Sequence, residues 1–378
     1  MEQAELEQII EQARIDRVSN LSLVDMQINS IPESISNLSD LTWLTLDRNH
    51  LTVLPDSICI LSNLTCLSLS HNRISILPDN IGDLSNLNRL DLENNQLISL
   101  PENITRIVKI NYLYLNKNKL ISLPKNIGNI TELTYLNISI NNLSELPESV
   151  GSLSKLIYLS LSTNRLSALP ENICNLSRLA VLDLENNQIN SLPKNIGNLS
   201  GLRKLFLSDN QLNRLPWGLI RLSKLTELSL NNNPLIDLSM LQDLSKLKKV
   251  RFLDVDLPRR YWTKFSDWKA EWLLDEDNAE IRRVLIEQVG YDKICEELNA
   301  IDLDTWREYT LLKIDSLEIV YDEDGDPEWT EPMVLVKMTC PSTQHIHILR
   351  VPPEMTSAEA AITWVNHGIH PDEFAVQT

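Results

Sequence analysis

The sequence predicts an α/β solenoid of about ten repeats, with a parallel sheet on its concave face, followed by a smaller α+β domain. Three observations predict this architecture: a 23-residue internal repeat, two residue ladders that keep step with it, and a change of composition near residue 257. A chain of 378 residues is long enough for two such domains.

The repeat is plain in residues 61–83, LSNLTCLSLSHNRISILPDNIGD, whose pattern recurs every 23 residues with almost no insertions. One ladder is an asparagine at the same place in nine successive repeats: Asn49, Asn72, Asn95, Asn118, Asn141, Asn164, Asn187, Asn210 and Asn233. The other ladder is a proline in nine repeats: Pro32, Pro55, Pro78, Pro101, Pro124, Pro147, Pro170, Pro193 and Pro216. Two such ladders in phase do not arise by chance.

Each part of the repeat has a physical role. The two leucines of LxL lie on one face of a short strand, because side chains alternate along a strand. Because a strand this short is not stable alone, it pairs in parallel with the strand of the next repeat and buries its leucines in a shared core. The ladder asparagine is expected to bond backbone groups that the bend leaves unpaired. Proline then suits an extended or turn segment on the convex side.

These motifs resemble the leucine-rich repeat family, in LTWLTLDRN at residues 41–49 and in LDLENNQINSLP at 182–193. The repeat length with LPxxI is similar to the intracellular subclass of scaffold and regulatory proteins. The resemblance covers about residues 15–257, and it implies a solenoid fold and a scaffold or regulatory role.

Both ends of the repeat array depart from the consensus. Residues 1–14 are predicted to form an N-terminal capping helix, and the repeats to span residues 15–257. An amphipathic helical stripe supports the capping helix: Leu6, Ile9, Ile10 and Ala13. Residues 258–378 are predicted to form an acidic, Trp-rich α+β domain that also caps the solenoid.

The residues between and beside the LxL leucines are predicted to point to the concave solvent side. Tyr112, Tyr135 and Tyr158 fall in one row of adjacent strands, and Tyr114 lies beside them. Acidic groups flank this patch, at Asp91 and Glu93 on one side and at Asp183 and Glu185 on the other. The predicted partner-binding residues are Trp43, Arg89, Asp91, Glu93, Tyr112, Tyr114, Tyr135, Tyr158, Asp183, Glu185, Lys204 and Phe206.

Two interpretations of these rows remain open. The tyrosines either form a contact patch for a partner or stabilise neighbouring strands through their mutual contacts. The acidic groups either face a partner with Lys or Arg around an apolar centre or are solvated charges from a duplicated block. Their separation, about 19 Å across the sheet, is too wide for one paired-carboxylate catalytic site.

The C-terminal part has a different composition. Residues 258–378 carry 11 Lys and Arg against 25 Asp and Glu, together with six of the eight Trp, which is enough aromatic surface for a second core. One helical face is predicted from Tyr261, Phe265, Trp268 and Trp272. Further helices are predicted from Asn278, after Asp292, and from a capping box at Thr356 and Glu359 to about Asn366. Period-two segments predict strands: 309–315, 317–321, 333–340 and 345–351.

Residues 306–315 and 331–378 are similar to a domain of unknown function that is attached to bacterial leucine-rich repeat proteins. That likeness implies no catalytic residues. Cys340, His345 and His347, with His367 and His370, are the best zinc-ligand candidates, against ordinary strand and helix-end histidines. Residues 322–326 imitate a calcium loop only superficially, and Cys295 has no matched His or Asp motif.

Charge excludes several function classes. With 52 Asp and Glu against 34 Lys and Arg, the net charge of −18 argues against nucleic acid and against anionic membranes. Five scattered Cys indicate neither a disulfide framework nor a zinc ribbon, and the N-terminus does not resemble a signal peptide. We therefore predict a cytoplasmic, monomeric, non-enzymatic scaffold that needs no cofactor and binds a protein on its concave face. The alternative is that the C-terminal domain is a small enzyme or metal sensor targeted by the repeats.

Overall fold

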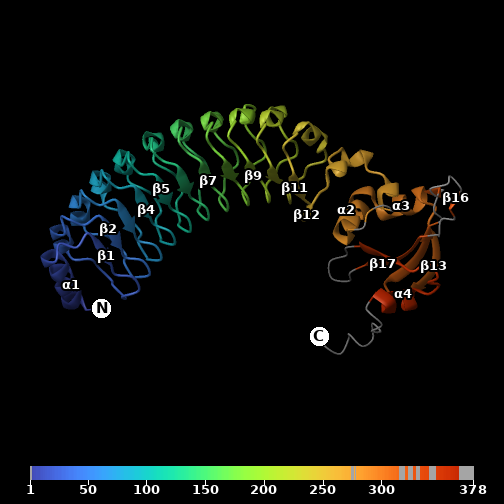
Figure 1. The fold of residues 1–378 in the computed structure, drawn as a ribbon, viewed down its shortest axis with the longest axis horizontal. Coiled ribbons are helices and arrows are strands. Elements are labelled where there is room, and N and C mark those ends of the chain that lie inside the picture. Colours follow the sequence, from blue (N-terminus) through green and yellow to red (C-terminus); the bar gives the residue numbers. More distant parts are fainter. Residues whose placement is uncertain are drawn as a thin grey trace. The chain divides into compact units, whose positions relative to one another are not determined.

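The structure is a computed structural model of the 378-residue chain (Figure 1). It describes residues 2–273, 276, 278–314, 320–321, 327–328, 333–339 and 346–365. The chain divides into two compact units, one of residues 1–236 and 240–256, and one of residues 237–239 and 257–378. Each unit is described by itself below.

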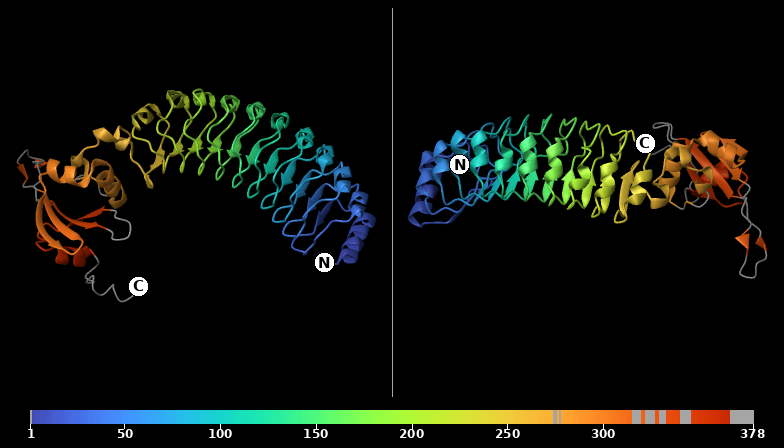
Figure 2. Two further views of the ribbon diagram at one scale, coloured as in Figure 1. Left: turned by 180° about the vertical axis from the view of Figure 1, so that it is seen from behind. Right: turned by 90° about the horizontal axis from the view of Figure 1, so that it is seen from above.

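The first unit is a curved solenoid whose strands line the inner side of the curve (Figures 1 and 2). Twelve strands follow one another in sequence order within one sheet: β1 (Asn20–Ser22), β2 (Trp43–Thr45), β3 (Cys66–Ser68), β4 (Arg89–Asp91), β5 (Tyr112–Tyr114), β6 (Tyr135–Asn137), β7 (Tyr158–Ser160), β8 (Val181–Asp183), β9 (Lys204–Phe206), β10 (Glu227–Ser229), β11 (Lys249–Phe252) and β12 (Val255–Asp256). The predicted parallel sheet is confirmed, and β11 extends it beyond the ten predicted strands. β12 then turns back antiparallel to β11.

Short 3-10 helices occupy the outer side of the curve, as the proline ladder predicts for a segment too tight for a long helix. They are η1 (Glu33–Asn37), η2 (Asp56–Ile60), η3 (Asp79–Asp83), η4 (Glu102–Arg106), η5 (Ile127–Asn129), η6 (Glu148–Ser152), η7 (Glu171–Asn175), η8 (Ile196–Asn198), η9 (Trp217–Arg221) and η10 (Ser239–Asp243). In most repeats the ladder proline directly precedes the first turn, and its carbonyl accepts from the amide three residues on, as Pro55 does from Ile58 at 3.1 Å. Proline fits there because its φ is fixed and its missing N–H is not needed.

Leucine and isoleucine layers fill the space between the strands and the 3-10 helices, and most of these side chains are fully buried. At the N-terminus, α1 (Gln3–Ile15) contacts η1 and buries three side chains of the predicted stripe: Leu6, Ile10 and Ala13. Ile9, the fourth, is only half-buried. Burial of an apolar stripe at the open end keeps the first layer of the core from water.

The ladder asparagines are buried and bond the backbone of two successive repeats. The amide Nδ2 of Asn141 donates to the carbonyls of Leu115, Ile138 and Ser139 at 2.9, 3.0 and 3.2 Å. Its Oδ1 accepts from the amide of Leu120 at 2.9 Å. The predicted bonds to the backbone are confirmed, and each ladder asparagine also ties its own turn to the preceding one.

The residue before each ladder asparagine has a left-handed backbone, which lets the chain turn sharply after the strand. These residues are Arg48, His71, Asn94, Lys117, Ile140, Thr163, Asn186, Asp209 and Asn232, with φ between 51° and 58°. Ile140 and Thr163 are β-branched, and side chains of that shape clash with the backbone in this region. The solenoid geometry thus imposes local strain at these two positions.

The second unit contains a four-stranded antiparallel sheet in the order β13-β14-β17-β18. Its elements are α2 (Ala279–Val289), α3 (Tyr291–Glu297), β13 (Ile301–Trp306), β14 (Tyr309–Ile314), β15 (Val320–Tyr321), β16 (Pro327–Glu328), β17 (Met333–Thr339), β18 (Ile346–Val351) and α4 (Ala358–Val365). Figure 2 shows α2 and α3 on one face of the sheet and α4 on the other. The predicted α+β arrangement is confirmed, but β13 was not predicted.

Two local predictions in this unit were wrong. The aromatics at 261–272 do not share an α-helix but follow three 3-10 turns, η11 (Arg259–Tyr261), η12 (Phe265–Asp267) and η13 (Ala270–Leu273). Their rings still cluster, with Tyr261 5.6 Å from Trp268 and 5.4 Å from Trp272. At the start of α4, the amide of Ala360 donates to the Oγ of Ser357 and not to that of Thr356. The amide of Ala358 donates to the carboxylate of Asp304, on β13, at 2.8 Å. Ring packing and a carboxylate distant in sequence decide these details.

We expect Asn141→Ala to destabilise the repeat unit by about 1–3 kcal/mol, because it leaves buried backbone groups of two turns without partners. Asn233 makes the same set of bonds, to Leu207, Leu230, Asn231 and Leu212, so Asn233→Ala should cost a comparable amount. Denaturant unfolding of both variants, with the exposed Asn129→Ala as control, measures the loss. A loss no greater than that of the control would contradict this role.

We expect Ile140→Asn to stabilise the repeat unit by about 0.5–1 kcal/mol, because asparagine tolerates the left-handed backbone and isoleucine does not. Ile140 is 45 % exposed, so the change removes little buried apolar surface. Ile121→Asn is a matched control, because Ile121 is similarly exposed but is not among the described residues with positive φ. Equal midpoints for the two variants in denaturant unfolding would show that no strain is relieved.

Candidate protein-binding site

Four tyrosines of β5, β6 and β7 form one aromatic surface on the inner side of the solenoid. Tyr112, Tyr135 and Tyr158 are direct partners in the parallel register, so their side chains leave the sheet on the same face. The rings of Tyr135 and Tyr158 stack, with centroids 4.4 Å apart and planes 2° apart. The ring centroids of Tyr112 and Tyr114 lie 6.4 and 5.0 Å from that of Tyr135. We call Tyr112, Tyr114, Tyr135 and Tyr158 the tyrosine strip.

The strip is partly packed and partly accessible. Tyr112 is 42 % exposed, whereas the other three rings are half-buried against one another. Burial, together with the neighbouring Tyr158, raises the pKa of Tyr135 to about 12. The ring contacts stabilise the adjoining strands, and the outer faces of the same rings remain free to touch a partner.

On the N-terminal side of the strip, the predicted acidic pair is neutralised by cations of the protein itself. Arg89 Nη2 lies 3.1 Å from Asp91 Oδ2, and the Arg89 guanidinium lies 4.5 Å from the Tyr114 ring centroid. Lys117 Nζ lies 2.8 Å from Glu93 Oε1. Burial raises the pKa of Asp91. The hydrogen bonds from the Glu93 amide and from Arg89 lower this pKa, but they offset the effect of burial only in part. Burial also opposes ionisation of Glu93, but the hydrogen bond and charge of Lys117 hold its pKa below the ordinary value.

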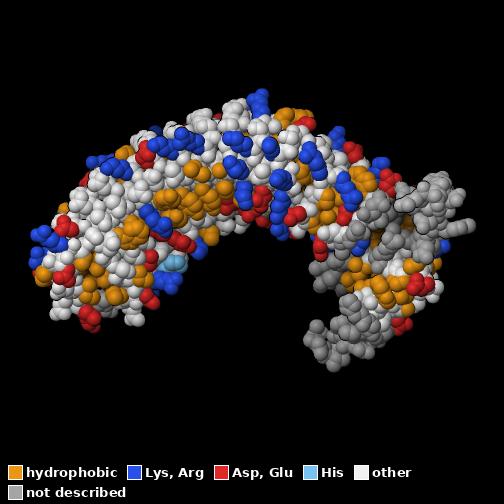
Figure 3. Space-filling view, in the orientation of Figure 1, with side chains coloured by type: hydrophobic (Ala, Val, Ile, Leu, Met, Phe, Trp, Pro, Cys, Tyr) orange, Lys and Arg blue, Asp and Glu red, His pale blue; other side chains and the backbone are white. Residues whose placement is uncertain are grey.

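On the C-terminal side, the second acidic pair borders a hollow of about 270 Å³ on the strand face. Phe206 of β9 and Ser229 of β10 line this hollow, and Asp183 and Glu185 lie at its edge. Figure 3 shows apolar side chains gathered over the middle repeats, with Asp and Glu beside them. A small serine next to a phenylalanine leaves room above the sheet, so the hollow follows from the sequence of these strands.

Two other predicted site residues are placed within the same sheet. Trp43 on β2 is 48 % exposed and donates from Nε1 to Thr45 Oγ1 at 2.9 Å. Lys204 on β9 forms an ion pair with Glu227 at 2.8 Å. Glu227, Lys249 and Arg251 also line the hollow but were not predicted as site residues. Glu227 lies in the predicted outward row, and continuing the rows by one strand, to β11, reaches Lys249 and Arg251.

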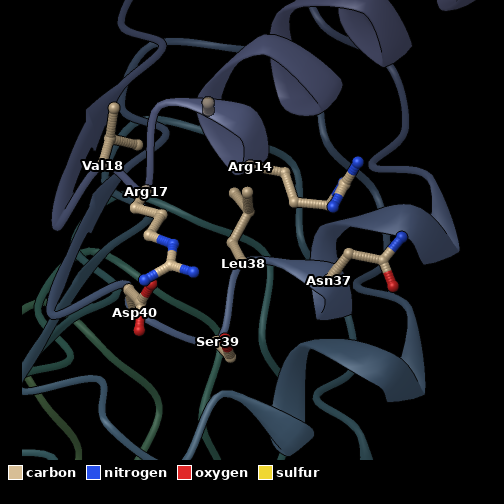
Figure 4. A pocket seen from close by; sticks show the side chains of 8 residues that line it. Arg14, Arg17, Val18, Asn37, Leu38, Ser39 and Asp40 are labelled. Atoms are coloured by element: carbon tan, nitrogen blue, oxygen red, sulfur yellow. The ribbon is translucent and has the colours of Figure 1, made fainter.

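A second hollow, of about 650 Å³, lies at the N-terminal end of the solenoid and was not predicted. Its lining comes from the end of α1, the segment after it, and the end of η1 with the residues that follow (Figure 4). The lining residues are Ala13, Arg14, Arg17, Val18, Asn37, Leu38, Ser39 and Asp40. Arg14 Nη2 is engaged by Glu11 at 2.6 Å. Acidic and basic groups share this lining, so its charge favours no one class of ligand.

The candidate metal ligands fall where little is described. Cys340 and His345, and also His367, His370 and residues 322–326, lie outside the described residues, as does the side chain of His347. Within the described part of the chain, no group of three or more His, Cys, Asp or Glu is placed to hold a metal ion. No helix there is long and apolar enough to cross a membrane. Burial raises the pKa of the Cys59, Cys66 and Cys174 thiols, which disfavours the reactive thiolate.

The raised pKa of Tyr135 makes folding stability depend on alkaline pH. Above the ordinary tyrosine pKa of 10, the unfolded chain releases a proton that folded Tyr135 keeps until about 12. The unfolded state is therefore favoured as pH rises through this range. We expect the wild type to lose more stability between pH 8 and pH 11 than Tyr135→Phe, measured by denaturant unfolding. Equal losses would show that Tyr135 is not protected in the fold.

Comparison with known proteins agrees with this geometry. No curated protein matches the sequence significantly. Among solved structures, an internalin (inlF) from Listeria monocytogenes is 24 % identical with a TM-score of 0.52, covering 66 % of this chain and 80 % of its own. FLRT2, solved in a complex with Latrophilin 3 and Unc5D, is 24 % identical with a TM-score of 0.54, covering 69 % and 82 %. A TDR receptor is 29 % identical with a TM-score of 0.53; the match covers 65 % of this chain and only 49 % of the receptor.

The family comparison adds sequence to this likeness of fold. The profile of the leucine-rich repeat region family matches residues 17–96 and 148–356, which is most of the chain. The matched residues include most repeats of the solenoid and extend into the second unit. This chain therefore belongs to the leucine-rich repeat region family.

Proposed function

We propose that this protein is a non-enzymatic scaffold that binds a protein partner on the concave face of its repeats, with the tyrosine strip at the centre of the contact. The observation that carries the proposal is the in-register row of Tyr112, Tyr135 and Tyr158 on three adjacent strands. Aromatic side chains held at this spacing form a rigid surface that loses little conformational entropy on binding.

The environment of the strip supports a binding role. Tyr135 has neighbours on both sides, so a partner that covers it would exclude water from a fully packed centre, as in binding hot spots. The phenol groups add hydrogen-bonding capacity to an apolar surface. Charged residues surround the strip, and such a rim fixes the register of a partner and the rate of its association more than its affinity.

Membership of the leucine-rich repeat family supports the same class of function, and the FLRT2 repeats are themselves part of a protein complex. We further propose that the protein acts in the cytoplasm as a monomer. Its net charge of −18 opposes binding to nucleic acid or to an anionic membrane.

We expect Tyr135→Ala to weaken partner binding by at least about 2 kcal/mol, as truncation of a central hot spot does. Tyr135→Phe, which keeps the ring, should cost far less. The partner is first captured on immobilised wild-type protein, and its affinity for each variant is then measured by titration. Normal binding by Tyr135→Ala, with loss of capture by Lys125→Glu on the opposite side of the repeat, would refute the proposal.

A further inference from the structure

Two identical segments of the solenoid lie four repeats apart and flank the tyrosine strip. Residues 90–96 and 182–188 both read LDLENNQ. Their backbones agree in detail, because Asp91 Oδ1 accepts from the Glu93 amide at 3.1 Å and Asp183 Oδ1 from the Glu185 amide at 3.2 Å. The two segments therefore form the same turn at the end of a strand of the same sheet.

Their charge partners, however, differ. Arg89 and Lys117, which neutralise the first pair, are replaced at the corresponding positions of the second copy by Val181 and Asp209. Asp183 accepts from the Ser160 hydroxyl at 2.8 Å. Among the residues that the structure describes, no cation forms an ion pair with Asp183 or Glu185. The second pair thus retains its negative charge toward solvent.

Each acidic pair has an aromatic residue beside it, but among the described residues only the first copy has a cation that contacts both the carboxylate and the ring. In the first copy, Arg89 bonds Asp91 and at the same time covers the Tyr114 ring. The residue that corresponds to Tyr114 is Phe206, which lines the hollow next to Asp183 and Glu185. A guanidinium or ammonium group placed there would repeat both contacts, a charged hydrogen bond and a cation–π contact.

Cations near the hollow do not fill this role. Lys204 is paired with Glu227 at 2.8 Å, and Lys249 with Asp256 at 3.2 Å. Arg251 lines the hollow from β11, whose backbone lies three strands, or about 14 Å, from that of β8. Among the ion pairs of the described residues, none joins Arg251 to Asp183 or Glu185.

From this asymmetry we infer that Asp183, Glu185 and Phe206 form a specific subsite for a Lys or Arg side chain of the protein partner. The partner then lies across the repeats in one direction, with its basic residue over β8 and β9 and its apolar residues over the tyrosine strip. This inference rests on the proposed function, and it assigns no partner contact to Asp91 and Glu93, whose charges are used within the protein.

The test uses two fluorescein-labelled peptides of Leu, Tyr and Ser, one ending in two Arg and the other in two Glu. Binding to the full chain is followed by fluorescence anisotropy at 50 and 300 mM NaCl. We expect the Arg peptide to bind at least tenfold more tightly than the Glu peptide at the lower salt. D183N/E185Q should weaken the Arg peptide at least fivefold and reduce its salt dependence. D91N/E93Q, the matched control in the first copy, should change it less than twofold.

A second variant tests the same subsite independently, in case D183N/E185Q does not fold. V181R/D209K introduces into the second copy the cations that the first copy already carries, and it should remove the preference for the Arg peptide as D183N/E185Q does. Absence of binding, absence of a preference, or equal losses in D91N/E93Q and D183N/E185Q would overturn the inference. If Tyr135→Ala weakens the Arg peptide and D183N/E185Q does not, only the subsite is wrong. If D183N/E185Q weakens binding of the Arg peptide and Tyr135→Ala does not, the subsite is supported and the proposed role of the tyrosine strip is wrong.

Discussion

A buried side-chain amide in every repeat is the interaction on which the solenoid depends. Each ladder asparagine satisfies backbone carbonyls of its own turn and of the turn before it, and it accepts from a backbone amide of the preceding repeat. These groups lie where the chain bends too sharply for regular strand pairing, and leaving them unpaired in the core would be costly. Because the bonds join residues 21 and 26 positions apart, they also fix the stacking of one repeat on the next.

Constant stacking makes the inner face a regular array. Residues 23 positions apart become neighbours across the sheet, so a single substitution per repeat is enough to change the surface without disturbing the core. The tyrosine strip arises in this way, from three tyrosines at one position of three successive repeats. The same rule places Phe206 beside Asp183 and Ser229, and so creates the hollow. The function proposed for this face depends on variation at a few positions of an otherwise uniform frame.

Electrostatics then distinguishes surfaces that share the same backbone. The two LDLENNQ segments share the same hydrogen bond from the Glu amide to the Asp carboxylate. One acidic pair is held by Arg89 and Lys117, however, and the other has Val181 and Asp209 in their places. A carboxylate that is paired with a cation of the same protein attracts a basic partner less, because the two charges offset each other and both groups are already desolvated in part. Charge is therefore distributed unevenly along the inner face, although the repeats are nearly identical.

The repeat pattern alone predicts the solenoid, the strand register, the bonding asparagines and the position of the tyrosines, because a strict repeat turns local pattern into spatial order. The sequence also predicts the approximate bounds of most helices and strands of the α+β region. Tertiary structure alone decided the turns of residues 259–273, where packing among Tyr261, Trp268 and Trp272 outweighs helical periodicity. It also decided that Asp304 caps α4, and that Asp91 is neutralised while Asp183 is not. The physical reason is the same in each case: these outcomes depend on contacts between specific side chains, and the periodicity of the sequence carries no information about which side chains meet.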